Sequence, residues 1–243
     1  MFDLLPPISR AGLIGLVGVW VLAYIVGMVF GRPNEDRSRR LAVPARLVMI
    51  GVVLLAALLW LGVTGGRPAG YGWLIFLGLA AGAVGDLILA DVFNLRRPVI
   101  AGMAVFGAGH VLYLSAVLRL RAQLGAGGVL PVVLAAGAGA AVVIVVWALV
   151  LRSPAAGRAL DVGSLLYGAL LGMTTALAAL LWLETGRMAT LAVGMALFLL
   201  SDLLLASYLL RRRGFVSIRD VVWLIYSAGQ ALIAFSIGAA GVG

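Results

Sequence analysis

Residues 72–91 read GWLIFLGLAAGAVGDLILAD, an apolar run with one ionisable residue in its interior, Asp86, and a second, Asp91, at its end. A run of about 20 residues crosses the hydrocarbon core of a bilayer as an α-helix. Seven more runs of similar length occur, and the alternation of apolar and polar residues that marks a membrane β-barrel is absent. The sequence therefore predicts an all-α integral membrane protein with eight transmembrane helices, expected at residues 11–30, 44–63, 72–91, 99–118, 129–151, 160–183, 188–209 and 219–239.

The composition agrees with this class of protein. Hydrophobic residues make up 64% of the chain and charged residues 11%, and the mean hydropathy is +1.17, far above that of a globular domain. The first run follows Asp3, the pair Pro6-Pro7 and a single Arg10, so it lacks a basic leader and is too long for a signal-peptide core. We expect it to be a span. Cysteine is absent, which excludes disulfides and thiolate metal sites.

The net charge of +9 comes from 18 basic residues, all of them arginine, against nine acids. Thirteen of the arginines fall in or beside the loops that follow the first, third, fifth and seventh spans, and five lie on the other face. The positive-inside rule then places those loops in the cytoplasm and both termini outside it, in what we expect to be a bacterial inner membrane. A nucleic-acid surface is not expected, because no basic stretch is interleaved with aromatic residues.

Two short sequence blocks recur, which predicts an internal repeat. GDLILA at residues 85–90 matches SDLLLA at 201–206, and AGHVL at 108–112 matches AGQAL at 228–232. The alternative is a chance likeness between leucine-rich segments. If the repeat is real, one domain of residues 1–243 consists of two parallel four-helix halves, about 1–125 and 126–243. Asp86 and Asp202 would then lie at similar depth and face one cavity.

These two aspartates are the first candidates for chemistry. A carboxylate at membrane depth is costly and usually marks a functional site. Apolar surroundings favour the neutral acid, and a second carboxylate nearby separates the two titrations, so an acid and a base can coexist. Gly78 and Gly82 precede Asp86 at intervals of four, which directs Asp86 into the helix bundle. The alternative is that each aspartate only bonds a neighbouring helix.

Five polar residues near the repeated blocks are candidates for substrate binding. His110, the only histidine, shares a helix face with Tyr113, and Gln230 holds the equivalent place with Tyr226 one turn before it. Ser201 adjoins Asp202, but without a nucleophile elbow it is better suited to packing or to a backbone bond. A metal site formed by the two aspartates and His110 would need more histidines, so we predict no metal and no cofactor.

Other polar and aromatic residues receive structural interpretations. Tyr167 and Met173 are expected to pack in the core. Three acids at loop edges are expected to be solvated by water, and several aromatic residues near span ends are expected to anchor the protein at the interface. The acids are Asp91, Glu184 and Asp220, and the aromatic residues include Trp20, Tyr24, Trp60, Trp73, Trp182 and Trp223.

Taken together, the blocks resemble the YhhN-like lysoplasmalogenases, a family of polytopic membrane proteins. The resemblance rests on LGLAAGAVGDLIL at 77–89, FGAGHVLY at 106–113, YGALLGM at 167–173, FLLSDLLLA at 198–206 and YSAGQALI at 226–233. One departure concerns the second span. Family members often carry a Lys-Pro pair there, whereas this chain has Val43-Pro44 followed by Arg46, so Arg46 or Arg40 would have to supply the basic group.

The resemblance implies hydrolysis of the vinyl ether bond of a lysoplasmalogen, which gives a fatty aldehyde and a glycerophospho-headgroup product. Vinyl ethers hydrolyse by proton delivery to carbon and capture of an oxocarbenium ion by water, which requires an acid, a base and a water path. Asp86 and Asp202 would be that pair. His110, Tyr113, Tyr226 and Gln230 would line the pocket, and arginines on the cytoplasmic side would attract the phosphate. The partners expected are a lysolipid substrate and the bilayer.

Two other functions fit the same sequence features. Paired repeats with carboxylates inside the membrane are equally natural in a transporter or flippase for a small solute or lysolipid. Such a protein would move its substrate across sealed vesicles without breaking a bond. A purely structural membrane partner would tolerate substitution of both aspartates.

Overall fold

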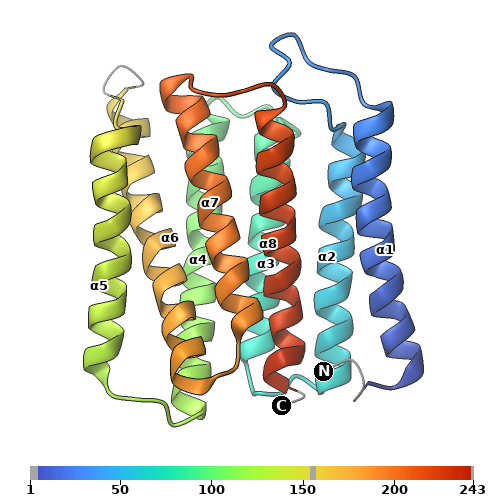
Figure 1. Ribbon diagram of the computed structural model, residues 1–243, viewed down its shortest axis with the longest axis vertical. Coiled ribbons are helices and arrows are strands. Elements are labelled where there is room, and N and C mark those ends of the chain that lie inside the picture. The colour runs from blue at the N-terminus through green and yellow to red at the C-terminus, as the bar shows by residue number, and fades with distance from the viewer. Residues whose placement is uncertain (1–4, 154–156, 242–243) are drawn as a thin grey trace.

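The computed structural model describes residues 5–153 and 157–241, and its elements are helical throughout these ranges (Figure 1). Within them, eight helices are long and apolar enough to cross a membrane, as predicted, so the chain is a multi-pass integral membrane protein. The helices are α1 (Pro7–Phe30), α2 (Val43–Thr64), α3 (Tyr71–Leu89), α4 (Pro98–Gln123), α5 (Val129–Val146), α6 (Arg158–Thr185), α7 (Ala189–Arg211) and α8 (Ile218–Gly241).

The observed bounds extend the predicted apolar runs by a few residues at most ends. Hydropathy marks only the part of a helix inside hydrocarbon, whereas backbone hydrogen bonding continues into the polar region. Proline lies in the first turn of α1, α2 and α4, where its missing N–H costs nothing. The fifth predicted run divides, because α5 ends in a π-helical turn, η2 (Trp147–Leu151).

Helices that follow each other pack as antiparallel hairpins: α1 with α2, α3 with α4, α5 with α6, and α7 with α8. Contacts of α8 with α2 and α3, and of α6 with α4 and α7, join these hairpins into one bundle. α1 and α5 lie at its two edges (Figure 1). Only 11% of the apolar window of α1 and 6% of that of α5 is buried, against 61% for α8, so the outer helices present their apolar side chains to lipid. A relation between the two halves stays a prediction.

Glycines allow the backbones of α7 and α8 to touch. A Cβ atom added to Gly194 would lie 2.8 Å from the carbonyl oxygen of Gly229, and one added to Gly229 would lie 2.8 Å from the carbonyl oxygen of Gly194. Small residues permit such approach between membrane helices. This contact fixes the position of α7, which carries Asp202, against α8, which carries Tyr226.

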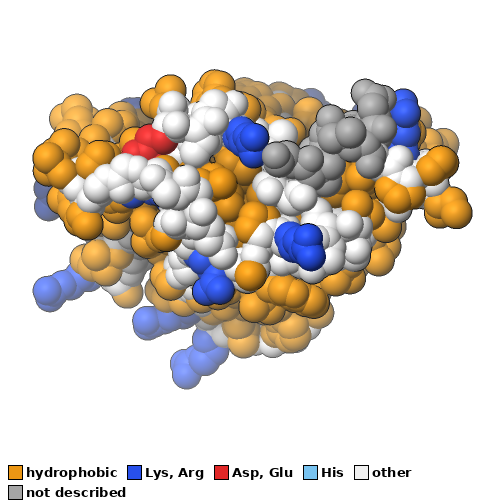
Figure 2. Space-filling view, turned by 90° about the horizontal axis from the view of Figure 1, so that it is seen from below, with side chains coloured by type: hydrophobic (Ala, Val, Ile, Leu, Met, Phe, Trp, Pro, Cys, Tyr) orange, Lys and Arg blue, Asp and Glu red, His pale blue; other side chains and the backbone are white. Residues whose placement is uncertain are grey.

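The loops that follow α1, α3, α5 and α7 lie at one end of the bundle, which we call the arginine-rich end (Figure 1). The opposite end shows scattered arginine side chains and acidic atoms among apolar side chains and backbone (Figure 2). The α1–α2 loop crosses to the start of α8, where the amide N–H of Ser217 donates to the carbonyl of Arg37 and that of Arg219 donates to the carbonyl of Ser38, both at 2.8 Å. Which end faces the cytoplasm stays a prediction.

The packing of the bundle overturns two sequence expectations. Asp220 is not solvated: it is 1% exposed, because its carboxylate accepts the backbone N–H groups of Arg40 and Leu41 at 2.7 and 2.8 Å. Trp60 and Trp223 are not interfacial anchors, because both are buried against neighbouring helices. Glu184, another of the acids expected to be solvated, pairs with Arg121 at 2.7 Å near the opposite end.

Candidate functional site

A cavity of about 230 Å³ lies inside the bundle and extends toward the arginine-rich end. Both Asp86, from α3, and Asp202, from α7, line it. The remaining lining comes from α2, α4, α5, η2, α6 and α8 and from the α1–α2 loop, so segments from most of the chain contribute to one space. Two acids separated by more than a hundred positions in the sequence therefore share one chamber.

Asp86 is held in place by a short chain of polar side chains. It lies near the end of α3, is 8% exposed, and accepts a hydrogen bond of 2.8 Å from the hydroxyl of Tyr226. The side-chain amide of Gln230 donates from Nε2 to the same tyrosine oxygen at 2.8 Å, and the hydroxyl of Tyr113 donates to the side-chain oxygen Oε1 of Gln230 at 3.2 Å. The face that carries Gly78, Gly82 and Asp86 is buried, which confirms that Asp86 points into the bundle.

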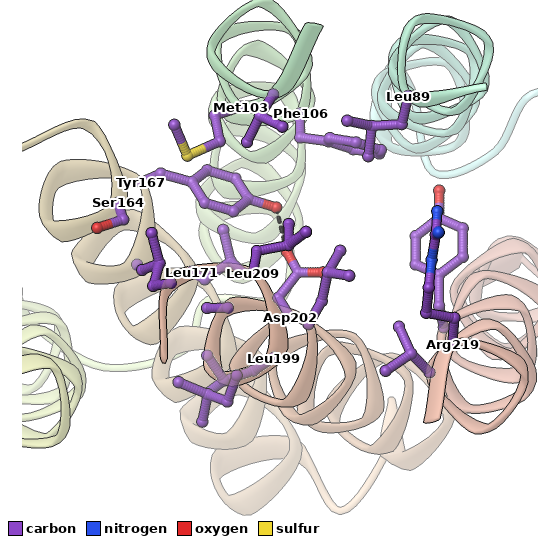
Figure 3. A pocket seen from close by; sticks show the side chains of 18 of the residues that line it. Leu89, Met103, Phe106, Ser164, Tyr167, Leu171, Leu199, Asp202, Leu209 and Arg219 are labelled. Carbon is purple, nitrogen blue, oxygen red and sulfur yellow. Dashed lines mark hydrogen bonds between the residues drawn. The ribbon is translucent and has the colours of Figure 1, made fainter. Parts of the chain in front are cut away.

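The side chain of Asp202 is oriented by the hydroxyl of one tyrosine. The hydroxyl of Tyr167, on α6, donates to its Oδ2 oxygen, and Figure 3 shows the tyrosine ring reaching toward the carboxylate. Asp202 keeps intermediate exposure because part of its surface faces the cavity. The expectation that Tyr167 only packs in the core is therefore wrong. Its place in the YGALLGM block was the only sequence signal for a role.

The cavity has two chemically different parts. Toward the loops, basic and acidic side chains surround it, with the indole of Trp223 among them: Arg39, Arg46, Arg219 and Asp220. The part of the cavity enclosed by α5, η2, α6 and α7 is lined almost entirely by apolar side chains, among them Val143, Leu151, Leu171, Leu199, Leu203 and Leu210. Asp202 and Tyr167 lie beside this apolar part, and Arg219 lies on the far side of the space from Tyr167 (Figure 3).

Arg46 is the basic residue of the second span that reaches the cavity. Its guanidinium carbon lies 5.4 Å from the ring centroid of Trp223, within the range of a cation–π contact. Arg40, the other candidate, is exposed and donates from Nε to the carbonyl of Gly31 at 2.9 Å. Trp223, expected at the membrane interface, instead forms part of the cavity wall.

Two groups of the α1–α2 loop have pKa values that differ from the ordinary ones. Burial and the positive charge of Arg219 lower the pKa of Arg39, which lines the cavity from the α1–α2 loop. Hydrogen bonds from the Tyr208 hydroxyl and from the hydroxyl and backbone N–H of Ser38 hold the pKa of Asp36 below its ordinary value. Asp36 therefore stays ionised and ties this loop to α7.

The other predicted binding residues divide into two groups. Tyr226 lines the cavity, and Gln230 lines a small adjoining pocket that also touches Asp86 and Tyr226. Tyr113, His110 and Ser201 are buried and are not among the residues that line the cavity. Their roles in binding stay predictions.

His110 lies in a cluster of aromatic rings. Its ring centroid is 4.7 Å from that of Phe198, 5.5 Å from Tyr113 and 6.2 Å from Tyr167, each in an edge-to-face arrangement. Neither ring nitrogen has a hydrogen-bond partner among the described residues. Ser201 donates to the carbonyl of Phe198 at 2.7 Å, in keeping with the backbone bond expected from its position.

This arrangement is suited to proton transfer on an amphipathic molecule. Each carboxylate is oriented by a phenol from a different helix, and both face a space that joins an apolar compartment to a cationic one. A group that must donate or accept a proton has to be held within hydrogen-bond reach of the reacting atom. The catalytic role of either aspartate stays a prediction.

No curated protein and no solved structure matches this chain. A family model does: that of the YhhN family matches residues 45–237, from the first turn of α2 to near the end of α8. The match includes every helix that carries a site residue. Because it covers more than half of the sequence, the chain belongs to the YhhN family, the lysoplasmalogenase family.

Proposed function

We propose that this protein hydrolyses the vinyl ether bond of lysoplasmalogen-type lysolipids. Membership of the YhhN family supports this activity at the level of the class of enzyme. The observation that carries the proposal is the shared cavity, in which two carboxylates stand between an apolar compartment and a cationic one. A lysolipid has the same order of parts: a hydrocarbon chain, the ether linkage and a phosphate headgroup.

The reaction consumes one water molecule and needs no other reactant. A neutral carboxylic acid protonates the vinyl carbon that is not bonded to oxygen, and the electron pair of the double bond forms the new C–H bond. The ether oxygen then stabilises the resulting oxocarbenium ion. Water attacks the carbon bonded to oxygen while a carboxylate removes the proton of that water. The hemiacetal formed transfers its hydroxyl proton to the glycerol oxygen and breaks the C–O bond, which releases a fatty aldehyde and the glycerophospho alcohol.

Asp86 and Asp202 would serve as the acid and the base of these steps, in an order that we leave open. A negative carboxylate beside the oxocarbenium ion also stabilises its positive charge, as carboxylates do for the related cation in glycoside hydrolysis. Tyr226 and Tyr167 would position the two groups through their hydrogen bonds. Their contribution is orientation of the carboxyl groups rather than proton transfer to the substrate.

The test is release of fatty aldehyde by purified protein in detergent. Asp86→Asn and Asp202→Asn keep the size of each side chain and remove the titratable group, so each should lower the rate by about 10²–10⁴-fold. Asp91→Asn is the matched control, because Asp91 is an exposed acid in the α3–α4 loop and should leave the rate unchanged. Wild-type activity in either cavity variant would refute the assignment.

The same preparation distinguishes the competing function. A transporter or flippase would release no aldehyde from lysoplasmalogen in detergent, and would instead move lysolipid across sealed proteoliposomes without chemical change. That result would overturn the proposed hydrolase.

A further inference from the structure

The most buried arginine of the cavity, Arg46, has two N–H-bearing nitrogens without an acceptor in the part of the chain that the structure describes. Arg46 is 9% exposed, and among the described residues its Nε and Nη2 nitrogens lack a hydrogen-bond partner. Burying a charged group without hydrogen bonds is costly, so buried guanidinium groups in proteins are almost always paired. Its contact with the face of Trp223 does not satisfy these two N–H donors.

The nearby acids are already engaged. The carboxylate of Asp220 accepts two backbone N–H groups of the α1–α2 loop, and Asp86 accepts the hydroxyl of Tyr226. No ion pair of Arg46 with either of them occurs in the described part of the chain. A molecule that occupies the cavity can therefore supply the acceptors that these two nitrogens lack.

Two further arginines face the same space. Arg39 approaches from the α1–α2 loop and Arg219 from the first turn of α8, and both line the cavity with Arg46. Three guanidinium groups around one compartment favour an anion. A phosphate offers several oxygen acceptors, and the planar guanidinium can donate to two of them at once, whereas an ammonium group acts as a point charge.

We propose that Arg46, assisted by Arg39 and Arg219, binds the phosphate group of the substrate. That the phosphate belongs to a lysolipid rests on the proposed function; the chemistry of the site alone requires only a phosphate ester or free phosphate. The site fixes the direction of the substrate: the headgroup lies at the arginine-rich end, the ether linkage lies at Asp86 and Asp202, and the chain runs among the leucines of α6 and α7.

The experiment measures binding without turnover. The ligands are a saturated 1-alkyl lysophospholipid, which has no vinyl bond to cleave, and the matching 1-alkyl glycerol, which has no phosphate. Arg46→Gln should weaken binding of the phospholipid about tenfold or more, the effect of losing a charge-assisted hydrogen bond, and should change binding of the alkyl glycerol less than twofold. The affinity of Arg46→Lys for the phospholipid should lie between those of the wild type and Arg46→Gln, because lysine keeps the charge and loses the paired donors.

Arg211→Gln is the matched control, since Arg211 is an exposed arginine at the same end and is not among the residues that line the cavity. It should bind both ligands as the wild type does. Inorganic phosphate then distinguishes the two sources of the anion. If millimolar phosphate competes with the lysophospholipid in the wild type but not in Arg46→Gln, the site also binds free phosphate. If phosphate competes in neither protein, the site is specific for the lipid headgroup.

Two results would overturn the proposal. An equal loss of affinity for both ligands in Arg46→Gln would mean that Arg46 only supports the fold, and unchanged affinity for both would mean that it does not meet the phosphate. Neither result depends on catalysis. Failure of the hydrolase proposal would be seen as missing aldehyde release, with the preference for the phosphate ligand intact.

Discussion

Asp220 holds the α1–α2 loop against the start of α8, and its replacement by asparagine should release that loop. The carboxylate accepts the N–H of Arg40 at 2.7 Å and that of Leu41 at 2.8 Å, in a place where Leu41 and Asp220 are each 1% exposed. Asparagine keeps one acceptor oxygen, but its NH₂ group meets the second N–H with a donor. One charge-assisted hydrogen bond is lost and one buried donor is left unpaired.

The loss is about 1.5–3 kcal/mol, the range for a hydrogen bond to a charged group. Since about 1.4 kcal/mol corresponds to a factor of ten, the open form of the loop should become roughly 10- to 100-fold more populated. Trypsin reports that population directly, because the peptide bonds after Arg39 and Arg40 contain the two N–H groups that Asp220 accepts. Cleavage of a transiently open segment follows its equilibrium population when closing is fast.

The assay is limited trypsin digestion in detergent, with the rates of cleavage after Arg39 and Arg40 followed by mass spectrometry. Asp91→Asn controls for removal of one negative charge, because Asp91 is exposed at the same end of the bundle. Equal cleavage rates in Asp220→Asn and the wild type would refute the reasoning, since the loop would then be held by other contacts.

Three further outcomes are expected. Tyr226→Phe removes the 2.8 Å hydrogen bond from the Tyr226 hydroxyl to Asp86 and should lower the rate of aldehyde release about tenfold with little change in unfolding temperature. Gly82→Ala places a Cβ 2.8 Å from a side-chain amide nitrogen and should destabilise by about 1–3 kcal/mol, measured by thermal unfolding, whereas Gly51→Ala meets nothing within 4 Å and should not. The hydrogen bonds that lower the pKa of Asp36 stabilise the loop fully above the ordinary aspartate pKa of about 3.9, and this stabilisation decreases as the pH falls below that value. Protection of the Ser38 amide from hydrogen exchange should decrease over the same pH range, and this pH dependence should be absent in Asp36→Asn.

The fold and the two central acids could be predicted because each leaves a local signal. Eight apolar runs of bilayer length specify eight helices, and their polar ends account for the small differences in the bounds. Asp86 and Asp202 stand out because an acid inside such a run is rare. The spacing of Gly78, Gly82 and Asp86 also indicated the buried face of α3, since residues four apart share one side of a helix.

The hydrogen-bond partners and the burial of several polar residues could not be predicted, because contacts between distant segments of the chain decide them. Asp220 lies at the edge of a loop in the sequence, yet its hydrogen-bond partners are 180 and 179 positions away. Tyr167 resembles any other aromatic residue of an apolar helix until α6 is placed beside α7. The sequence left the basic group of the second span open between Arg46 and Arg40, and only the packing of α2 against α8, which buries Arg46 beside Trp223, distinguishes them.

The position of the cavity along the bundle bears on the choice between an enzyme and a transporter. Asp86 precedes the last residue of α3, Leu89, by three positions, so it lies about 4.5 Å along the axis from the end of that helix. Transporters of the repeat type hold their substrate near the midplane and open to both faces in turn. Here the opposite half of the bundle is filled by fully buried Trp60 and Tyr71, and Tyr71 is joined to Ser236 by a hydrogen bond of 2.7 Å. Asp202 lies deeper, nine positions or about 13.5 Å before the last residue of α7, Arg211. A cavity that extends to one end of the bundle, with a packed core beneath it, favours a reaction in which water and lipid enter from the same side of the membrane.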